Sequence, residues 1–218
     1  MPQSSDSPGQ TPDPRSVLRA ATQDRHERLD QSLVVGAAGA GYADYVAYIA
    51  ALRGWLAPVE EAVWNRPWPE TLLAPRRRGK VAWIDADLQA ARAAAVAVPA
   101  LPACTRLPAG LSDDAYALGV AYVIEGSQLG GRMMAKRLQR DFPQYSFRYM
   151  DGYGAELGAM WKGFIEFLPT RLREAAALDQ AVAGARDAFD SLSDWLAACG
   201  RMGVPAMTTD SAPAPESR

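Results

Sequence analysis

The sequence predicts an all-α fold in a single domain, and three features support this prediction. Apolar residues recur at spacings of three and four through several long segments, which is the period of an amphipathic helix. No segment shows sustained alternation of period two, so β-strands are not expected. The chain has 218 residues, which is enough for one domain with a sizeable core.

Three helices are expected in the first half of the chain. The first covers residues 16–32, with Ser16 as its N-cap, because a serine side chain accepts hydrogen bonds from the free amides of a first turn. The second covers residues 42–64 and carries one apolar stripe at helical spacing, formed by Tyr45, Ile49, Leu52, Leu56, Val59 and Val63. The third covers residues 81–98 and is rich in alanine. After it, residues 99–110 (PALPACTRLPAG) contain three prolines and are expected to form a connecting loop.

Three more helices are expected in the second half. Ser112 or Asp113 is expected to cap a long helix that ends at about Arg140. Two further helices are expected over residues 155–171 and 179–199, and the last carries a buried stripe of Val182, Ala185, Phe189, Leu192 and Leu196. Residues 1–14 and 203–218 have the composition of disordered tails, so residues 15–202 are the expected domain.

The charge composition argues against a nucleic-acid-binding surface. The chain has 23 lysines and arginines against 25 aspartates and glutamates, and its net charge is -2, whereas nucleic-acid-binding domains usually show a strong basic excess. The one dense basic run is RRRGK at residues 76–80. We expect it to be a solvated loop or the start of a helix. The alternative is a docking patch for an acidic partner protein.

The cysteines and the hydropathy pattern favour a cytoplasmic protein. Cys104 and Cys199 stand far apart in the sequence and outside any C-x-x-C arrangement, so a disulfide framework or a zinc site is not expected. No apolar stretch reaches the roughly 18 residues of a membrane span. The N-terminal residues are polar and proline-rich, unlike a secretory signal. We expect no membrane partner, and the balance of soluble helices favours a monomer.

One predicted helix carries an unusual number of glycines. Gly126, Gly130 and Gly131 lie within YVIEGSQLGGRMMAKRL (122–138), and Gly119 precedes them by one heptad. A glycine inside a helix costs roughly 1 kcal/mol relative to alanine. Residues seven and eleven positions apart nearly superpose on a helix, so most of these glycines form one bare stripe. Two interpretations remain open: close packing against another helix, or a flat ligand lying against the helix backbone.

The single histidine of the chain, His26, lies in the first predicted helix and favours the ligand interpretation. Arg19 and Thr22 share its face, and Arg19 lies about 10 Å away along the axis. Asp30 follows at i+4, where its carboxylate reaches the second imidazole nitrogen and orients the ring. An axial imidazole, an orienting acid and a cation two turns away suit a porphyrin. The alternative is that His26 is an ordinary core or surface residue that binds no ligand.

A lone histidine also excludes several kinds of site. A second histidine ligand for zinc or non-heme iron does not exist in the chain. The G-x-S-x-G motif of α/β hydrolases and the Glu-x-x-His pairs of di-iron bundles are absent. No flavin or nicotinamide fingerprint and no Fe–S cysteine pattern occurs either, so any electrons must come from another chain.

LRAATQDRHERLD (18–30) together with EGSQLGGRMMAKRL (125–138) resembles the bacterial branch of the heme oxygenases, the biliverdin-producing enzymes. The resemblance covers most of residues 15–200. It implies an all-α fold in which heme b is both cofactor and substrate and O₂ is the second substrate. It also implies that the proximal helix supplies His26 as the axial ligand of the iron. The distal helix is implied to bend over the heme at Gly126, Gly130 and Gly131, where absent side chains allow close approach.

The chain departs from the family at one position of the distal helix. Many members carry an aspartate there that holds a water network, and here the matching residue is Ser127, with Glu125 nearby in sequence. Proton delivery through Ser127 and ordered waters is therefore a hypothesis. Met133 and Met134 are expected in the core rather than on the iron, because the sixth coordination position must stay open.

The resemblance also suggests which residues bind the heme propionates. Arg19 matches a family lysine in position and charge. Lys162 occupies roughly the place of a basic residue of the family, and Tyr122 is a candidate hydroxyl donor. Arg132 is equally well explained as a surface residue. Placement of these groups sets the in-plane rotation of the heme and with it the biliverdin isomer.

The expected function is therefore conversion of heme to biliverdin with release of Fe²⁺ and CO. The expected electron donor is a ferredoxin, a flavodoxin or a reductase, with residues 76–80 as a candidate docking site. A bilin acceptor such as a phytochrome is a further expected partner. Two alternatives remain: a heme carrier or sensor that does not degrade heme, and a helical enzyme with a non-heme substrate in which His26 is structural.

Overall fold

The computed structural model describes residues 12–203, so the expected tails lie almost wholly outside the described residues. The long helices are α1 (Pro14–Ser32), α2 (Tyr42–Trp64), α4 (Lys80–Ala93), α5 (Asp114–Asp141), α7 (Leu157–Arg171) and α8 (Ala175–Ala198). Short helices α3 (Ala74–Arg77) and α6 (Arg148–Asp151) and the 3₁₀ turns η1 (Val34–Gly36), η2 (Glu70–Leu72) and η3 (Gly154–Glu156) connect them. Residues 12–203 form no β-strand, only an isolated bridge between Leu33 and Met202. The all-α prediction is confirmed.

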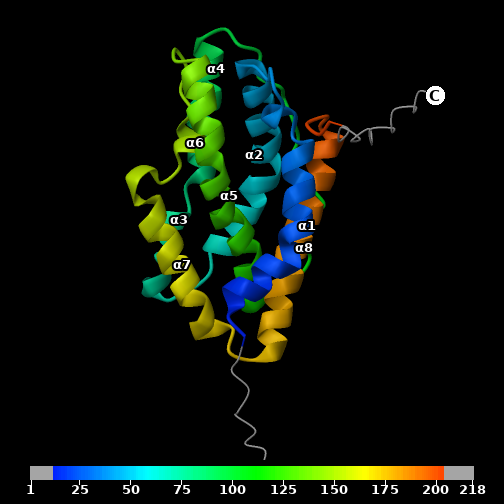
Figure 1. Cartoon of the computed structure of the whole chain (residues 1–218), viewed down its shortest axis with the longest axis vertical. Helices are drawn as coiled ribbons and strands as arrows, with labels where there is room; N and C mark the ends of the chain where they lie inside the picture. Colours follow the sequence, from blue (N-terminus) through cyan, green and yellow to red (C-terminus); the bar gives the residue numbers. More distant parts are fainter. Residues whose placement is uncertain (1–11, 204–218) are drawn as a thin grey trace, which may run out of the picture.

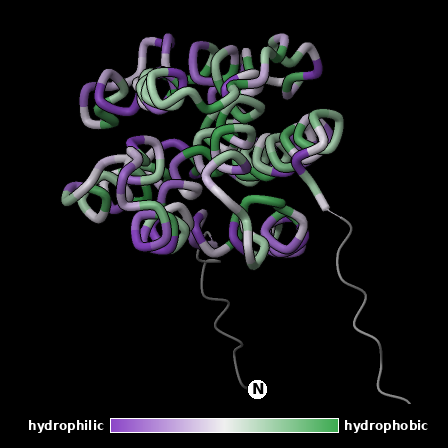
Figure 2. The backbone as a smooth tube through the Cα atoms, turned by 90° about the horizontal axis from the view of Figure 1, so that it is seen from above, coloured by the Kyte–Doolittle hydropathy of each residue, from purple (hydrophilic) through white to green (hydrophobic). Residues whose placement is uncertain are grey.

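The long helices run roughly along the long axis of the molecule, with α1 beside α8 (Figure 1). Both α1 and α5 pack along α8, and α2 packs against α4 and α8. The view from above in Figure 2 places hydrophobic segments toward the middle and hydrophilic ones mostly outside. The stripe predicted for α2 is part of this core, since Tyr45, Ile49, Val59 and Val63 are fully buried. In the described part of the chain, no helix is both long enough and apolar enough to cross a bilayer.

The helix ends show where local signals were read correctly and where they were not. α1 begins two residues before the predicted start, because Asp13 is the N-cap and Pro14 the first helical residue. The Asp13 carboxylate accepts hydrogen bonds from the backbone N–H and the hydroxyl of Ser16, and these bonds lower the pKa of Asp13. Ser16 therefore supports the cap rather than forming it. For α5, the expected cap Asp113 is confirmed, since its side chain accepts from Tyr116 N–H.

The other boundaries differ by a few residues. α4 ends at Ala93, five residues before the predicted end, and Ala95 then adopts a left-handed conformation with φ of 57°. α7 begins at Leu157 after the 3₁₀ turn η3, and α8 begins at Ala175, four residues before the predicted start. The short helices α3 and α6 were not predicted, because elements of four residues carry too little periodicity to be recognised.

α5 and α8 approach each other closely where each has a glycine. A Cβ atom on Gly119 of α5 would lie 1.8 Å from the carbonyl oxygen of Ala181, and one on Gly184 of α8 would lie 2.1 Å from that of Tyr116. These two glycines therefore serve helix packing. The single bare stripe predicted for the glycines of α5 is wrong in this respect, because Gly119 faces α8.

The basic run at residues 76–80 is not a uniformly solvated segment. Arg77 and Lys80 are buried, and both pair with the buried Glu125 of α5, at 2.5 Å and 2.7 Å. The Arg77 guanidinium also donates to the carbonyl oxygens of Leu72 and Met160. The expectation of a solvated run or a docking patch is therefore wrong for its two buried cations, and the partner that requires them is a distant residue of the same chain.

Candidate functional site

A groove with a volume of about 830 Å³ opens between α1 and α5. The two helices make little direct contact with each other, and each rests on α8, which leaves room between them. Most of the lining surface is apolar and comes from α1, α2, α5, α6, α7 and α8. The groove brings together nearly all the site residues expected from the sequence: Arg19, Thr22, His26, Asp30, Tyr122, Gly126, Ser127, Gly130 and Gly131.

His26 presents one free ring nitrogen at this groove. Its side chain is 57 % exposed, and its Nδ1 atom lies 3.1 Å from Oδ2 of Asp30, one turn further along α1. Phe189 of α8 meets the imidazole edge-on, with ring centroids 5.9 Å apart. Of the two ring nitrogens, Nδ1 faces Asp30 and Nε2 does not take part in this pair. Asp30 therefore lies where its carboxylate can orient the ring through Nδ1, which leaves Nε2 as the ring nitrogen available to a ligand.

Two of the three glycines of α5 that line the groove, Gly126 and Gly130, have no close packing partner that explains them. A Cβ atom on Gly130 would meet no atom within 4 Å, and one on Gly126 would only touch the Trp161 ring at 3.8 Å. Gly131 is tighter, because its Cβ would lie 3.3 Å from the sulfur of Met150. α5 continues through all three as one helix. Since alanine would be favoured at Gly130 on helix propensity alone, the bare backbone there favours the ligand interpretation.

Ser127 is a polar side chain of this wall and stands between Gly126 and Gly130 in the sequence. Its hydroxyl donates to the carbonyl oxygen of Ile124 at 2.8 Å. Glu125, its neighbour in sequence, points away into the buried ion pairs with the basic run. Tyr149 of α6 also lines the groove, and the side chains of Ser127 and Gln128 lie near its phenol. Sequence reasoning missed Tyr149 because it lies in a segment read as a loop, although tyrosines at 145, 149 and 153 follow a four-residue spacing.

One end of the groove carries positive charge. Arg15 and Arg19 of α1 line it together with Tyr122 of α5, and they lie close enough to act on the Tyr122 phenol. Burial raises the pKa of Tyr122, while the two arginines lower it. Arg15 was missed because it stands at the edge of the expected tail.

Two other candidate propionate ligands lie outside the groove. Lys162 is exposed on α7 and pairs with Glu166 at 3.0 Å. The exposed Arg132 donates to the carbonyl oxygen of Gly154 at 3.3 Å. By contrast, Arg137 does line the groove, and it ties α5 to η1 through bonds to the carbonyl oxygens of Val35 and Ala37.

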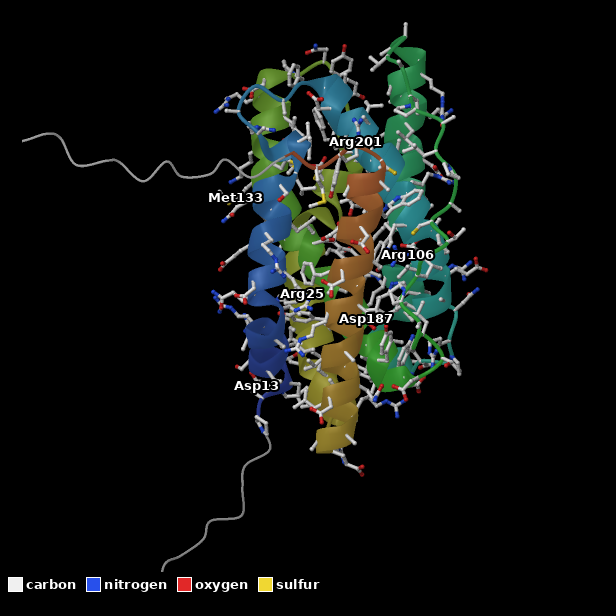
Figure 3. All side chains as sticks on the ribbon, turned by 90° about the vertical axis from the view of Figure 1, so that its right-hand side faces the viewer. Asp13, Arg25, Arg106, Met133, Asp187 and Arg201 are labelled. Carbon is white, nitrogen blue, oxygen red and sulfur yellow. The ribbon has the colours of Figure 1, made fainter. Side chains whose placement is uncertain are left out.

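The two methionines of α5 differ from expectation in part. Met134 is half-buried and packs against the core, but Met133 is 83 % exposed at the rim of the groove. Figure 3 shows Met133 at the edge of the molecule. The prediction of a core position is therefore wrong for Met133.

The residues of the groove fit a heme. A heme is a flat, largely apolar ring with a metal at its centre and two carboxylates at one edge. The groove offers apolar walls, the free Nε2 of His26, the unfilled space at Gly130 and the cations Arg15 and Arg19 at one end. Each chemical feature of the ligand therefore meets a group of the right kind.

Comparisons with known proteins agree with this geometry. A family model described as heme oxygenase matches residues 15–198. A protein named heme oxygenase from Xanthomonas campestris pv. campestris (strain 8004) is 38 % identical over 102 residues, which are 46 % of this chain and 61 % of the relative. The match thus spans less than two thirds of that relative. No solved structure matches the chain. Because the family model covers α1 to α8 and the whole groove between them, the chain belongs to the heme oxygenase family.

Proposed function

We propose that the protein is a heme oxygenase that cleaves heme b to biliverdin and releases Fe²⁺ and CO, using O₂ and electrons from another protein. The observation that supports this most strongly is one groove with the free imidazole nitrogen of His26 on one helix and the unfilled backbone of Gly130 on the other. A heme-binding site alone requires only the first of these. Open space beside the glycines is what a reaction with a small second substrate requires in addition.

The residues of α1 hold and orient the substrate in this proposal. His26 binds the iron through Nε2, and Asp30 fixes the orientation of the imidazole through Nδ1. Arg19 holds a propionate, with Arg15 and Tyr122 beside it. Arginine suits this task because its guanidinium keeps its charge and matches a carboxylate in geometry. Bound heme supplies the iron that activates O₂ and is itself the ring that is opened.

The residues of α5 shape the opposite wall. Gly126, Gly130 and Gly131 keep the wall low, so that a small molecule fits between it and the ring. Ser127 is a polar residue on the same wall, and we propose that protons reach the reaction through its hydroxyl and ordered waters. The wall carries no histidine, because the only one of the chain is His26.

The electrons are supplied by a ferredoxin, a flavodoxin or a reductase, since the chain carries no redox-cofactor fingerprint of its own. The two buried cations of residues 76–80 cannot contribute to a docking surface for it. We further propose a monomeric cytoplasmic protein, with a bilin acceptor such as a phytochrome as a downstream partner.

Titration with hemin tests the binding half of the proposal. We expect a Soret band distinct from that of free hemin, its loss or strong weakening in His26→Ala, and its recovery when imidazole is added to that variant. The imidazole rescue controls for misfolding, because free imidazole replaces only the missing ligand. A spectrum identical to free hemin with the natural chain would disprove the proposal.

Addition of a reductant and air to the heme complex tests the catalytic half. We expect loss of the Soret band, a biliverdin absorption spectrum and release of CO. Chromatography of the extracted pigment then identifies the isomer. A complex that binds hemin through His26 but leaves it intact under these conditions would instead identify a heme carrier or sensor.

A further inference from the structure

A buried phenol stands beside the glycine-bearing wall of the groove. Tyr149 is only 6 % exposed and lines the groove together with Gly126, Ser127 and Gly130. Burial raises the pKa of its phenol, and the nearby side chains of Ser127 and Gln128 lower it in part. No sequence signal links Tyr149 to Ser127, and their proximity arises because α6 folds back against α5.

A buried carboxylate holds Tyr149 firmly in this place. Asp87 of α4 is fully buried, and its carboxylate accepts hydrogen bonds from the backbone N–H groups of Arg148 and Tyr149, both at 2.8 Å. It also accepts the phenol of Tyr45 at 2.6 Å and the hydroxyl of Ser146 at 3.0 Å. Four donors on one carboxylate fix the start of α6 relative to α2 and α4. The backbone at Tyr149 is therefore fixed in place.

Ser127 by itself offers no donor to the groove. A hydroxyl has one hydrogen, and that of Ser127 is directed at the carbonyl oxygen of Ile124. Tyr149 can supply the missing donor, because burial raises its pKa to about 12 and it keeps its proton throughout the neutral range. An ionised aspartate, which many family members carry at the position of Ser127, can only accept hydrogen bonds.

A second observation shows that the polar groups here are not satisfied by the protein alone. Oε1 of Gln128 is buried and has no hydrogen-bond partner among residues 12–203. A Cβ atom on Gly152 would lie 2.3 Å from it, so the backbone of Gly152 packs directly against this amide. A buried carbonyl oxygen normally has a hydrogen-bond donor, so this acceptor remains open beside Tyr149.

We propose that Tyr149 is a positioning residue that donates a hydrogen bond to Oγ of Ser127, so that the Ser127 hydroxyl turns from the Ile124 carbonyl toward an anionic or polarised small ligand in the groove. Hydrogen bonds in such a chain strengthen one another. The wall thus presents a donor that is supported by a phenol, where related chains use a carboxylate. This inference rests on the proposed function, because the ligand concerned is one that lies beside a bound heme.

Fluoride binding to the ferric heme complex of the full chain tests this role without turnover. Fluoride is a small anion whose affinity depends on hydrogen bonds from the protein. We expect Tyr149→Phe and Ser127→Ala each to raise its Kd about tenfold, the usual effect of losing one hydrogen bond to a charged group. Because both act through the same hydroxyl, the double variant should bind fluoride within about twofold of Ser127→Ala.

Tyr42→Phe is the matched control. Tyr42 is also a buried tyrosine, its oxygen has no partner among the described residues, and it lies outside the groove, stacked on Tyr145. Its replacement should leave the fluoride affinity unchanged. Binding of CO to the reduced complex is a second control, since CO accepts hydrogen bonds poorly, and Tyr149→Phe should change it by less than about threefold.

The outcomes separate this inference from the proposed function. Unchanged fluoride affinity in Tyr149→Phe, in a protein that binds hemin normally, would overturn the inference alone. Losses that multiply in the double variant would overturn the route through Ser127. A parallel loss of CO affinity would show that the phenol merely maintains the shape of the groove. Failure of the natural chain to bind hemin would overturn both proposals.

Discussion

Gly119 and Gly130 are both glycines of α5, yet the structure gives them different roles. At Gly119 a methyl group would collide with the backbone of α8, whereas at Gly130 it would enter open space. Only the first position is explained by packing. The second is conspicuous because nothing in the protein prevents a side chain there, so the constraint must come from what binds in the groove.

Replacement of these two glycines by alanine should therefore have opposite effects on stability. Gly130→Ala should keep or raise the free energy of unfolding, by up to about 1 kcal/mol, because alanine favours the helix. Gly119→Ala should lower it by about 3 kcal/mol, because α5 and α8 must move apart. Urea denaturation without heme measures both.

The same Gly130→Ala variant should lose function while it keeps its fold. The added methyl group narrows the space beside the ring, so heme turnover should fall at least about tenfold, as expected for an obstruction at the reacting centre. Turnover like that of the natural chain would show that the bare wall has no role in the reaction.

Asp30 offers a second test at the scale of one residue. Asp30→Ala leaves His26 in place but removes the partner of Nδ1. We expect the Kd for hemin to rise about tenfold or more, because loss of such an orienting carboxylate costs about that factor in metal affinity. Glu27→Ala is the control, since Glu27 also lines the groove from α1 and carries the same charge.

At the scale of elements, the basic run 76–80 has cations both at the surface and in the interior. Arg76 pairs with Glu156 at the surface, with both side chains at least half exposed. Arg77 and Lys80 pair with Glu125 in the interior, one residue before Gly126. The buried pairs join α3 and α4 to the middle of α5, and they hold this helix where its glycines face the groove.

Removal of the two glutamates should show this difference. Glu125→Ala leaves two buried cations without their partner and should lower the free energy of unfolding by about 3–5 kcal/mol. Glu156→Ala breaks an exposed pair and should cost less than about 1 kcal/mol. Equal effects of the two changes in urea denaturation would contradict the assignment of the buried network as an anchor of α5.

The elements also show what can be predicted from the sequence. Periodicity predicted α2 correctly from end to end, and the spacing of Arg19, His26 and Asp30 placed them on one face of α1, because both depend on neighbours within a few turns. The burial of Lys80 and the presence of Tyr149 and Ser127 in one groove depend on which helices pack together. Nothing in the sequence next to Lys80 or Tyr149 indicates these long-range contacts.

At the scale of the whole molecule, α8 is the support on which both walls of the groove rest. α1 and α5 each pack along it, and Arg25 of α1 pairs with Asp190 of α8 at 2.9 Å. Figure 3 shows Arg25 on α1 beside α8. The width of the groove is therefore set by two interfaces with a third helix rather than by contact between its own walls.

Five buried or half-buried tyrosines predict how stability depends on pH. Burial raises the pKa of Tyr45, Tyr48, Tyr116, Tyr149 and Tyr153 above the usual value of 10. Above pH 10 the unfolded chain therefore loses phenol protons that the folded chain still holds. The stability that these groups contribute is complete below pH 10 and is lost as the pH rises toward their folded pKa values, by up to about 1.4 kcal/mol per pH unit for each phenol.

One buried group opposes this trend. Burial lowers the pKa of Lys80 below its usual value. Between the lowered and the usual pKa, the unfolded chain therefore binds more protons at Lys80 than the folded chain does. In this pH window the free energy of unfolding rises with pH. Five phenols outweigh one amine, so the free energy of unfolding should fall by several kcal/mol between pH 10 and pH 11. Urea denaturation at pH 8, 10 and 11 measures this, and Tyr45→Phe should flatten the fall. A free energy that stays level to pH 11 would show that the phenols ionise in place and that the core between α2, α4 and α6 is open to water.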